Sequence, residues 1–210
     1  IDAPLARNTD NAYDELDRLT QVTDPELGIT QYGYNALDQL LSVTDPRSLV
    51  TSYSYNALGD LKQQVSPDTG TTNNTYDSGG NLKTSTDARS KVGTYSYDAL
   101  NRVTSLVYTD QTITYTYDTG TNQKGRLTGL DSTGANLSWT YDSKGRVLTK
   151  TQVSNGNTKV ISYQYNAAGQ LTQITTPSNK VIVYGYANGK VSSITVGSTT
   201  LLNNVVYEPF

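Results

Sequence analysis

The stretch from Thr51 to Gly59 reads Thr-Ser-Tyr-Ser-Tyr-Asn-Ala-Leu-Gly, and it decides the fold. Its first half alternates large with small polar residues, which places the side chains of Thr51, Tyr53 and Tyr55 on one face of an extended strand. Its second half contains Asn56 and Gly59, residue types that favour tight turns. The stretch therefore predicts a half-buried β-strand that ends in a turn.

The same pattern recurs along the whole chain. Tyr-Asp or Tyr-Asn pairs follow one another at intervals of 21 residues in the first four steps and of 20 to 24 residues afterwards. Such a period accommodates two strands of about six residues and two turns, and it is too short for the common helical-pair repeats. We call each such pair the anchor of its repeat. The anchors are Tyr13 and Asp14, Tyr34 and Asn35, Tyr55 and Asn56, Tyr76 and Asp77, Tyr97 and Asp98, Tyr117 and Asp118, Tyr141 and Asp142, Tyr165 and Asn166, and the degenerate Tyr186.

A turn and a second strand follow each anchor. The turn contains Asp, Asn or Gly at a recurring position, four residues after the Tyr in most repeats, and these types tolerate positive φ, so we expect left-handed backbone there. The second strand starts with Leu or Val, and its apolar residues often lie three apart, as Leu19 and Val22 do. Since a flat strand would place such residues on opposite faces, we expect either a β-bulge or a sheet that is apolar on both faces. The glycines at the turn position are Gly59, Gly80, Gly125, Gly145, Gly169 and Gly189.

These observations predict an all-β fold. We expect tandem antiparallel β-hairpin repeats of about 21 residues in a continuous, twisted, spiralling sheet of about 18 strands, with no helix longer than about two turns. Residues 1–12 form an incomplete leading repeat, 13–206 form nine tandem repeats, and 207–210 start a further, truncated anchor. The outermost strands, near 11–13 and 203–207, are expected as open edges through which copies could associate end to end.

The composition excludes most catalytic chemistry. The 210 residues include no Cys, no Met and no His, so a Ser-His-Asp relay, a structural zinc site and a disulfide cannot form. We therefore expect no enzymatic activity, no cofactor and no metal. A net charge of −3 with mixed signs argues against nucleic acid as a partner, and no apolar run is long enough for membrane insertion. Because the sequence starts without Met and without an apolar signal segment, we expect a piece of a longer protein.

Three acidic patterns have both a chemical and a structural interpretation. The triplets that start at Asp68 and Asp118 have the Asp-Thr-Gly sequence found in the active sites of aspartic proteases. They occupy turns at opposite ends of the hairpins, and this separation favours a structural role. The Asp or Asn after each anchor Tyr could be a row of cation ligands. Because Asn replaces Asp freely, a hydrogen bond to the backbone N–H two residues on is favoured. The loop from Asp118 to Gly125 is rich in oxygen ligands but lacks the carboxylates of an EF-hand.

The tyrosine-rich face is the one candidate for ligand binding. Aromatic side chains can stack on sugar rings, and the candidate glycan platform consists of Trp139, Tyr163 and Tyr184. Tyrosines in every second position are more often the packing face of a sheet, and this interpretation is favoured.

The repeat resembles the YD repeat of RHS proteins. The closest copies are Gly145-Arg146-Val147, Thr44-Asp45-Pro46 and the stretch from Tyr97 to Arg102, and residues 206–210 look like the start of a Tyr-x-Pro-Phe-Gly ending. The resemblance extends from Tyr13 to Phe210. It implies a β-hairpin spiral that, in full-length members, closes into a hollow shell around a C-terminal toxin or effector. Members include bacterial RHS and insecticidal toxin-complex proteins, wall-associated proteins and the extracellular teneurins.

Two functions from different classes follow. The first is a non-enzymatic structural module, a shell fragment whose partners are the neighbouring repeats of the parent chain and an encapsulated C-terminal toxin. The resemblance implies that such a parent is secreted or displayed on the cell surface. The alternative is a carbohydrate or cell-surface binding module that uses the tyrosine-rich face.

Overall fold

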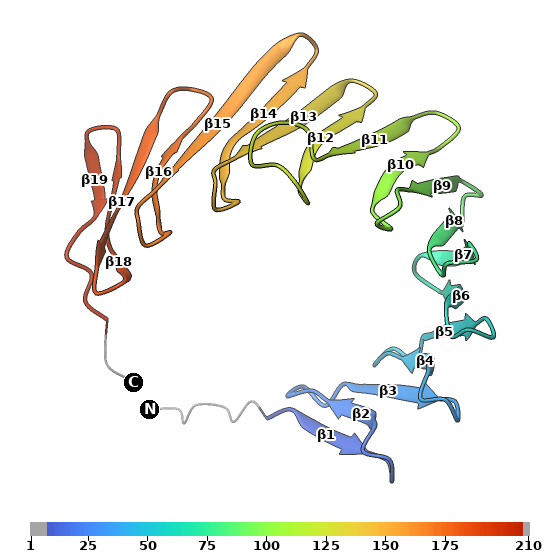
Figure 1. Cartoon of the computed structure of the whole chain (residues 1–210). Helices are drawn as coiled ribbons and strands as arrows, with labels where there is room; N and C mark the ends of the chain where they lie inside the picture. Colours follow the sequence, from blue (N-terminus) through green and yellow to red (C-terminus); the bar gives the residue numbers. More distant parts are fainter. Residues whose placement is uncertain (1–7, 208–210) are drawn as a thin grey trace, which may run out of the picture. The chain divides into compact units, whose positions relative to one another are not determined.

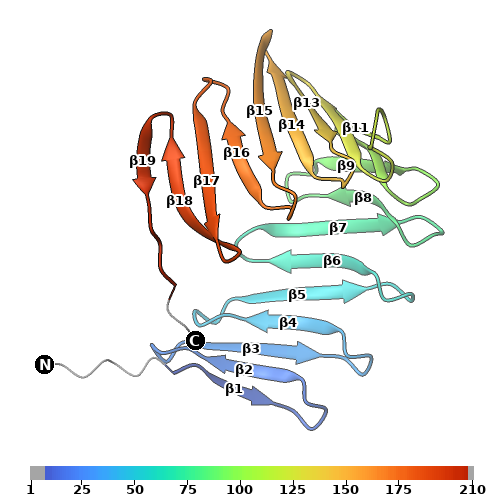
Figure 2. The ribbon, with the colours of Figure 1, turned by 60° about the vertical axis from the view of Figure 1, so that its left-hand side comes forward.

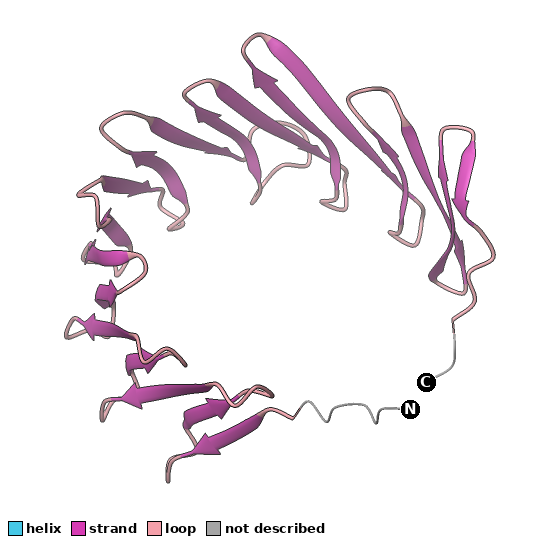
Figure 3. Ribbon diagram, turned by 180° about the vertical axis from the view of Figure 1, so that it is seen from behind, coloured by secondary structure: helices cyan, strands magenta, loops and turns pink. Residues whose placement is uncertain are grey.

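In the computed structural model the described residues are 8–207, and residues 1–7 and 208–210 lie outside them. Within this part the chain forms 19 strands, all in antiparallel pairings of one sheet, and it contains no helix (Figures 1 and 3). The predicted all-β fold class is confirmed, with one strand more than expected. None of the described residues belongs to a helix of the length and apolarity needed to cross a bilayer.

The chain divides into two compact units, residues 1–96 and residues 97–210. In the first unit, successive strands pair in the order of the chain, each antiparallel to its neighbours, as Figure 2 shows. Its strands are β1 (Asp10–Tyr13), β2 (Leu19–Thr23), β3 (Ile29–Tyr34), β4 (Leu40–Thr44), β5 (Val50–Tyr55), β6 (Leu61–Ser66), β7 (Gly70–Tyr76), β8 (Leu82–Thr86) and β9 (Val92–Tyr97).

The second unit continues the same alternation of strands. Its strands are β10 (Val103–Val107), β11 (Thr112–Tyr117), β12 (Leu127–Ser132), β13 (Ala135–Tyr141), β14 (Val147–Ser154), β15 (Asn157–Tyr165), β16 (Leu171–Thr175), β17 (Val181–Ala187), β18 (Lys190–Val196) and β19 (Thr199–Leu202).

The expectation of a terminal strand near residues 203–207 is wrong. The last strand ends at Leu202, because Asn204 has a φ of 50° and interrupts the extended backbone. Tyr207 nevertheless donates its hydroxyl to the carbonyl of Val191 at 2.9 Å.

One turn geometry recurs at both ends of several hairpins. In the turn after β5, the N–H of Asn56 donates to the carbonyl of Asp60 and the N–H of Gly59 donates back to Asn56, with φ of 90° at Gly59. In the turn after β4, Asp45 and Ser48 make the equivalent bonds, and Ser48 has a φ of 62°. Positive φ was expected for the anchor turns only. It was missed in the other turns because Ser48 and its equivalents Leu27 and Ser90 are not residue types that mark such a position.

A β-bulge precedes most of the anchor tyrosines. Tyr13 pairs with Leu19 and Ala12 pairs with Gln21, so Thr20 is an extra residue on β2. Since Asn11 pairs with Val22, the bulge brings Leu19 and Val22 to the same face in spite of their spacing. Of the two expected explanations for this spacing, the bulge is the correct one. Equivalent shifts occur in the pairs β3–β4, β5–β6, β7–β8, β11–β12, β13–β14, β15–β16 and β17–β18.

The sheet has almost no hydrophobic core. Among the described residues, Leu106 is the one hydrophobic side chain in the buried class, at 9% exposure. The accessible surface of 14264 Å² compares with roughly 9,600 Å² expected for a globular protein of this mass. Stability therefore depends on contacts between neighbouring strands more than on a packed interior.

The turn geometry predicts a specific effect at Gly80, where φ is 81° and no heavy atom lies within 4 Å of the Cβ position. Gly80→Val should lower the free energy of unfolding by about 1–2 kcal/mol, because the left-handed region is strained for a β-branched residue. Gly80→Asn should cost much less, since Asn101 occupies the equivalent position with φ of 58°. Urea unfolding midpoints measure both, and equal losses would contradict the assigned geometry.

Candidate functional site

The anchor Tyr of most repeats closes a gap between two strands. Backbone pairing of β4 with β5 covers Ser42–Thr44 and leaves Leu40 without a partner on β5. The hydroxyl of Tyr55 donates to the carbonyl of Leu40 at 2.8 Å and takes the place of that partner. We call this contact the tyrosine clamp. It recurs from Tyr34 to Leu19, Tyr76 to Leu61, Tyr117 to Val103, Tyr141 to Leu127, Tyr165 to Val147, Tyr186 to Leu171 and Tyr207 to Val191.

Burial affects the chemistry of these phenols. It raises the pKa of Tyr76, Tyr117 and Tyr165, because the ionised form is less well solvated. The hydroxyls therefore stay protonated and remain hydrogen-bond donors well above neutral pH.

The residue after each anchor Tyr organises the turn. The side-chain oxygen of Asn56 accepts the N–H of Leu58 at 2.9 Å and that of Asp60 at 2.9 Å. Only an oxygen acceptor is needed, so Asn and Asp serve equally, as the hydrogen-bonding interpretation predicted. Both bonds recur at Asp14, Asn35, Asp77, Asp98 and Asp142, and Asn166 makes the second of them. Asp118 instead accepts the N–H of Gly125, seven residues on in its longer loop.

Sequence reasoning missed a row of arginines that links successive anchors. Arg102 contacts Asp98 of its own anchor and Asp118 of the next, both at 2.7 Å. Its guanidinium lies 4.4 Å from the ring centroid of Tyr117, within the range of a cation–π contact. The hydrogen bond from Arg102 lowers the pKa of the Asp118 carboxyl. Arg18 and Arg146 likewise lie over Tyr34 and Tyr165 and pair with the Asp of their own anchor, but they reach the next anchor through the backbone carbonyls of Asn35 and Asn166. Their constant distance of five residues from an anchor Tyr was the available signal.

The two Asp-Thr-Gly triplets are engaged in ion pairs. Asp68 lies in the turn between β6 and β7, 3.0 Å from Arg47, and Asp118 follows β11 and binds Arg102. Each carboxylate is therefore bound by an arginine of its own unit. Within residues 8–207, no group of three or more His, Cys, Asp or Glu side chains is placed to hold a metal ion.

The candidate glycan platform lies on three alternate strands. Trp139, Tyr163 and Tyr184 belong to β13, β15 and β17 and are half-buried. Tyr163 pairs with Ile174, and Tyr184 pairs with Ile194, so aliphatic side chains alternate with the aromatic ones across the strands. This arrangement supports the packing interpretation.

The four-residue insertion after Tyr117 folds against the sheet. Gln123 is 6% exposed and donates to the carbonyl of Trp139 at 3.3 Å. A small pocket of about 280 Å³ beside it is lined by Thr116, Ser138 and Trp139 among others.

These features define a tandem β-hairpin repeat protein in which each repeat makes the same contacts with the next. The profile of the RHS Repeat matches residues 13–48, 34–71, 76–113, 141–181 and 165–200. The chain therefore belongs to the RHS repeat family.

Solved structures share the fold. The structure of the Photorhabdus luminescens Tc holotoxin pore with a TccC3 mutation aligns with a TM-score of 0.56 and 15% identity, over 91% of this chain and 13% of that chain. The crystal structure of TcdB2-TccC3 aligns with a TM-score of 0.52 and 13% identity, over 94% of this chain and 15% of that chain. The chain thus spans a small part of either protein. A comparison with curated proteins gives no significant match.

The tyrosine clamp predicts that removal of a single anchor hydroxyl lowers the stability of the fold. Tyr55→Phe should lower the free energy of unfolding by about 1–2 kcal/mol, because the carbonyl of Leu40 loses its donor in a partly buried place. Tyr53→Phe is the matched control two residues away, since no protein partner of its hydroxyl lies among the described residues. Chemical denaturation of both variants would show equal midpoints if the clamp were unimportant.

Acid should weaken the anchor turns. The backbone N–H of Asn81 and then its side chain lower the folded-state pKa of Asp77 from 3.8. The ionised carboxyl therefore adds stability above the unfolded pKa of about 3.9, and this contribution is lost as the pH falls below it. Asp77→Asn keeps the oxygen acceptor, as Asn35 and Asn56 do, but cannot be protonated. Urea midpoints between pH 6 and about pH 3 should fall less for the variant than for the wild type, and parallel curves would contradict the assignment.

Proposed function

We propose that the chain is a wall segment of an RHS shell, a structural module whose full-length protein encloses or presents a C-terminal toxin or effector. The observation that carries the proposal is the tyrosine clamp, which joins successive anchor strands to the strand before them by the same bond. A chain with this construction gains its stability from neighbouring repeats, so it extends by addition of further hairpins, as a wall does.

The electrostatics of the carboxylates support a role without catalysis. Each Asp with a shifted pKa has it lowered, through backbone N–H groups or arginine side chains. A general acid that works near neutral pH needs a shift in the opposite direction. The carboxylates instead act as fixed acceptors that hold the turns.

The resemblance to RHS proteins extends the proposal to location and partners. A shell of this kind acts outside the cell that makes it, so the parent is secreted or displayed on the surface. Its partners are then the neighbouring repeats and the enclosed C-terminal segment.

Protease protection tests the enclosure. In the full-length parent protein, the C-terminal region should resist protease far longer than the same region expressed alone, because the wall excludes the enzyme. Tyr55→Ala should shorten the protection by weakening the wall, and Tyr53→Phe should leave it unchanged. Equal digestion of the enclosed and the isolated region would refute the shell function.

A glycan array tests the competing binding function. Specific binding of the wild-type chain that is lost on Trp139→Ala and Tyr163→Ala would favour recognition through the tyrosine-rich face. Absence of such binding, together with protease protection, is the outcome expected for a wall segment.

A further inference from the structure

The hairpin of β14 and β15 has the longest strands in the part of the chain that the structure describes. β14 (Val147–Ser154) and β15 (Asn157–Tyr165) have eight and nine residues, whereas the regular strands have about five to seven. The two strands are joined by Asn155 and Gly156 alone, both with positive φ, in place of the longer Asp-based turn. This hairpin therefore extends beyond its neighbour β16 at the end that carries the turn of Asn155 and Gly156.

The extension leaves part of β15 with one partner instead of two. β14 pairs with β15 from Asn157 to Ser162, but β16 pairs with β15 only from Ser162 to Tyr165. Residues 157–161 are therefore a strand edge inside the unit, and residues 157–160 are all exposed.

The register tells which backbone groups face the open side. A two-residue turn makes Ser154 and Asn157 a hydrogen-bonded pair, so Asn157 and Lys159 direct their N–H and carbonyl groups toward β14. The N–H and carbonyl groups of Thr158 and Val160 alternate with them and face away from β14. No partner for these four groups is present in the part of the chain that the structure describes.

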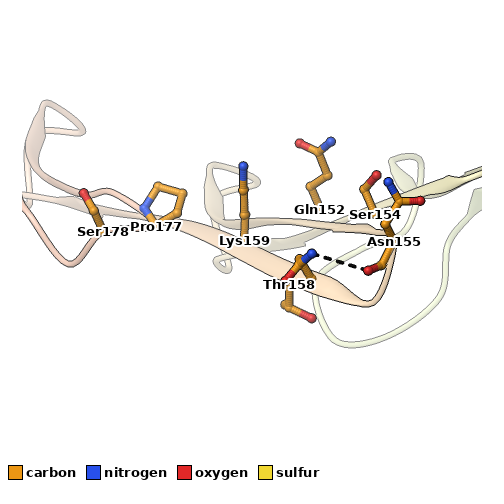
Figure 4. Close-up of a pocket in the computed structure, with 8 residues that line it drawn as sticks. Gln152, Ser154, Asn155, Thr158, Lys159, Pro177 and Ser178 are labelled. Atoms are coloured by element: carbon orange, nitrogen blue, oxygen red, sulfur yellow. Dashed lines mark hydrogen bonds between the residues drawn. The ribbon is translucent and has the colours of Figure 1, made fainter.

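A groove runs beside this edge. It has a volume of about 740 Å³ and is lined by Gln152, Ser154 and Lys159 of the long hairpin and by Pro177 and Ser178 of the turn after β16 (Figure 4). Its volume falls within the range of about 300–1,000 Å³ that is typical of ligand sites. Most of its lining is amide and hydroxyl, and Lys159 is its one charged side chain.

The segment of the chain that forms the groove carries charge of one sign. Residues 143–207 contain six Lys or Arg residues and no Asp or Glu, although the whole chain has a net charge of −3. Lys159 thus has no carboxylate of this region to pair with, and an acidic ligand would meet no like charge there.

We propose that the outer half of β15 binds an extended, acidic segment of a partner protein by β-strand addition. The segment pairs its backbone with the free N–H and carbonyl groups of Thr158 and Val160, and its carboxylates lie near Lys159. A polyanionic sugar could use the positive charge, but it could not use the alternating backbone donors and acceptors. A peptide strand uses both, and the observations therefore favour it.

The test uses a fluorescein-labelled, capped peptide of about eight residues with alternating Glu and Val, titrated with the whole chain. The peptide should bind, and fluorescence anisotropy should show about tenfold weaker binding when alternate amides are N-methylated, since each backbone bond lost costs of the order of 1 kcal/mol. Replacement of each Glu by Lys should abolish binding. Equal affinity of the methylated peptide would overturn the proposal in favour of a simple polyanion site, for which heparin is the reference ligand.

Variants of the chain locate the site. Val160→Pro removes an N–H group on the open side of β15. A strand edge tolerates this change because the hydrogen bonds between β14 and β15 remain, and the variant should not bind the peptide. Lys159→Gln should weaken binding about fivefold, whereas Lys144→Gln, in the anchor turn at the other end of β14, should leave it unchanged.

Three further outcomes would overturn the proposal. One is peptide binding that Val160→Pro leaves intact, with the variant folded as judged by circular dichroism. If that variant does not fold, the N-methylated peptide still decides whether backbone pairing occurs. The second outcome is no detectable peptide binding at millimolar concentration. The third is a dimer in sedimentation that the peptide cannot disrupt, because a second copy of the chain would then occupy the strand edge.

Discussion

The repeat depends on one contact. It is the hydrogen bond from an anchor Tyr hydroxyl to the carbonyl of the first residue in the preceding strand. Neighbouring strands separate at one end, as where β4 pairs with β5 only from Ser42 onward. The phenol of Tyr55 then reaches the carbonyl that the separation leaves open. Because so little apolar surface is buried, this bond and the arginine stacked on the ring replace much of what a core provides elsewhere.

Many of the turns at both ends of the hairpins follow one local rule. An oxygen on the first residue accepts two backbone N–H groups, and the fourth residue has positive φ, as in Asn56 and Gly59 or in Asp45 and Ser48. The turns that follow this rule are alike, and such regularity suits a wall. The long β14–β15 hairpin does not follow this rule. A free strand edge, a groove and a lysine without a carboxylate partner occur together there.

Much of the repeat could be predicted from residues close together in the chain. The alternation at Tyr53 and Tyr55 predicts a strand, and Asn56 and Gly59 predict its turn, because each depends on local backbone geometry. The spacing of Leu19 and Val22 predicts either a bulge or a sheet that is apolar on both faces, and the structure decides for the bulge. The left-handed backbone at Leu27 and Ser48 could not be predicted in this way, since neither residue type prefers it. The role of Arg102 was missed because it requires knowing that Asp118 and the ring of Tyr117 lie beside it.

The sequence by itself determined the period, the all-β class and the membership of a repeat family, because these depend on patterns that recur at short range. Only the tertiary structure decided which carbonyl each tyrosine meets, how the arginines join one anchor to the next, and where β15 extends beyond the strand beside it. The physical reason is that hydrogen bonds between strands join residues about 15 positions apart, as Tyr55 and Leu40 are, and their partners depend on the register of both strands at once.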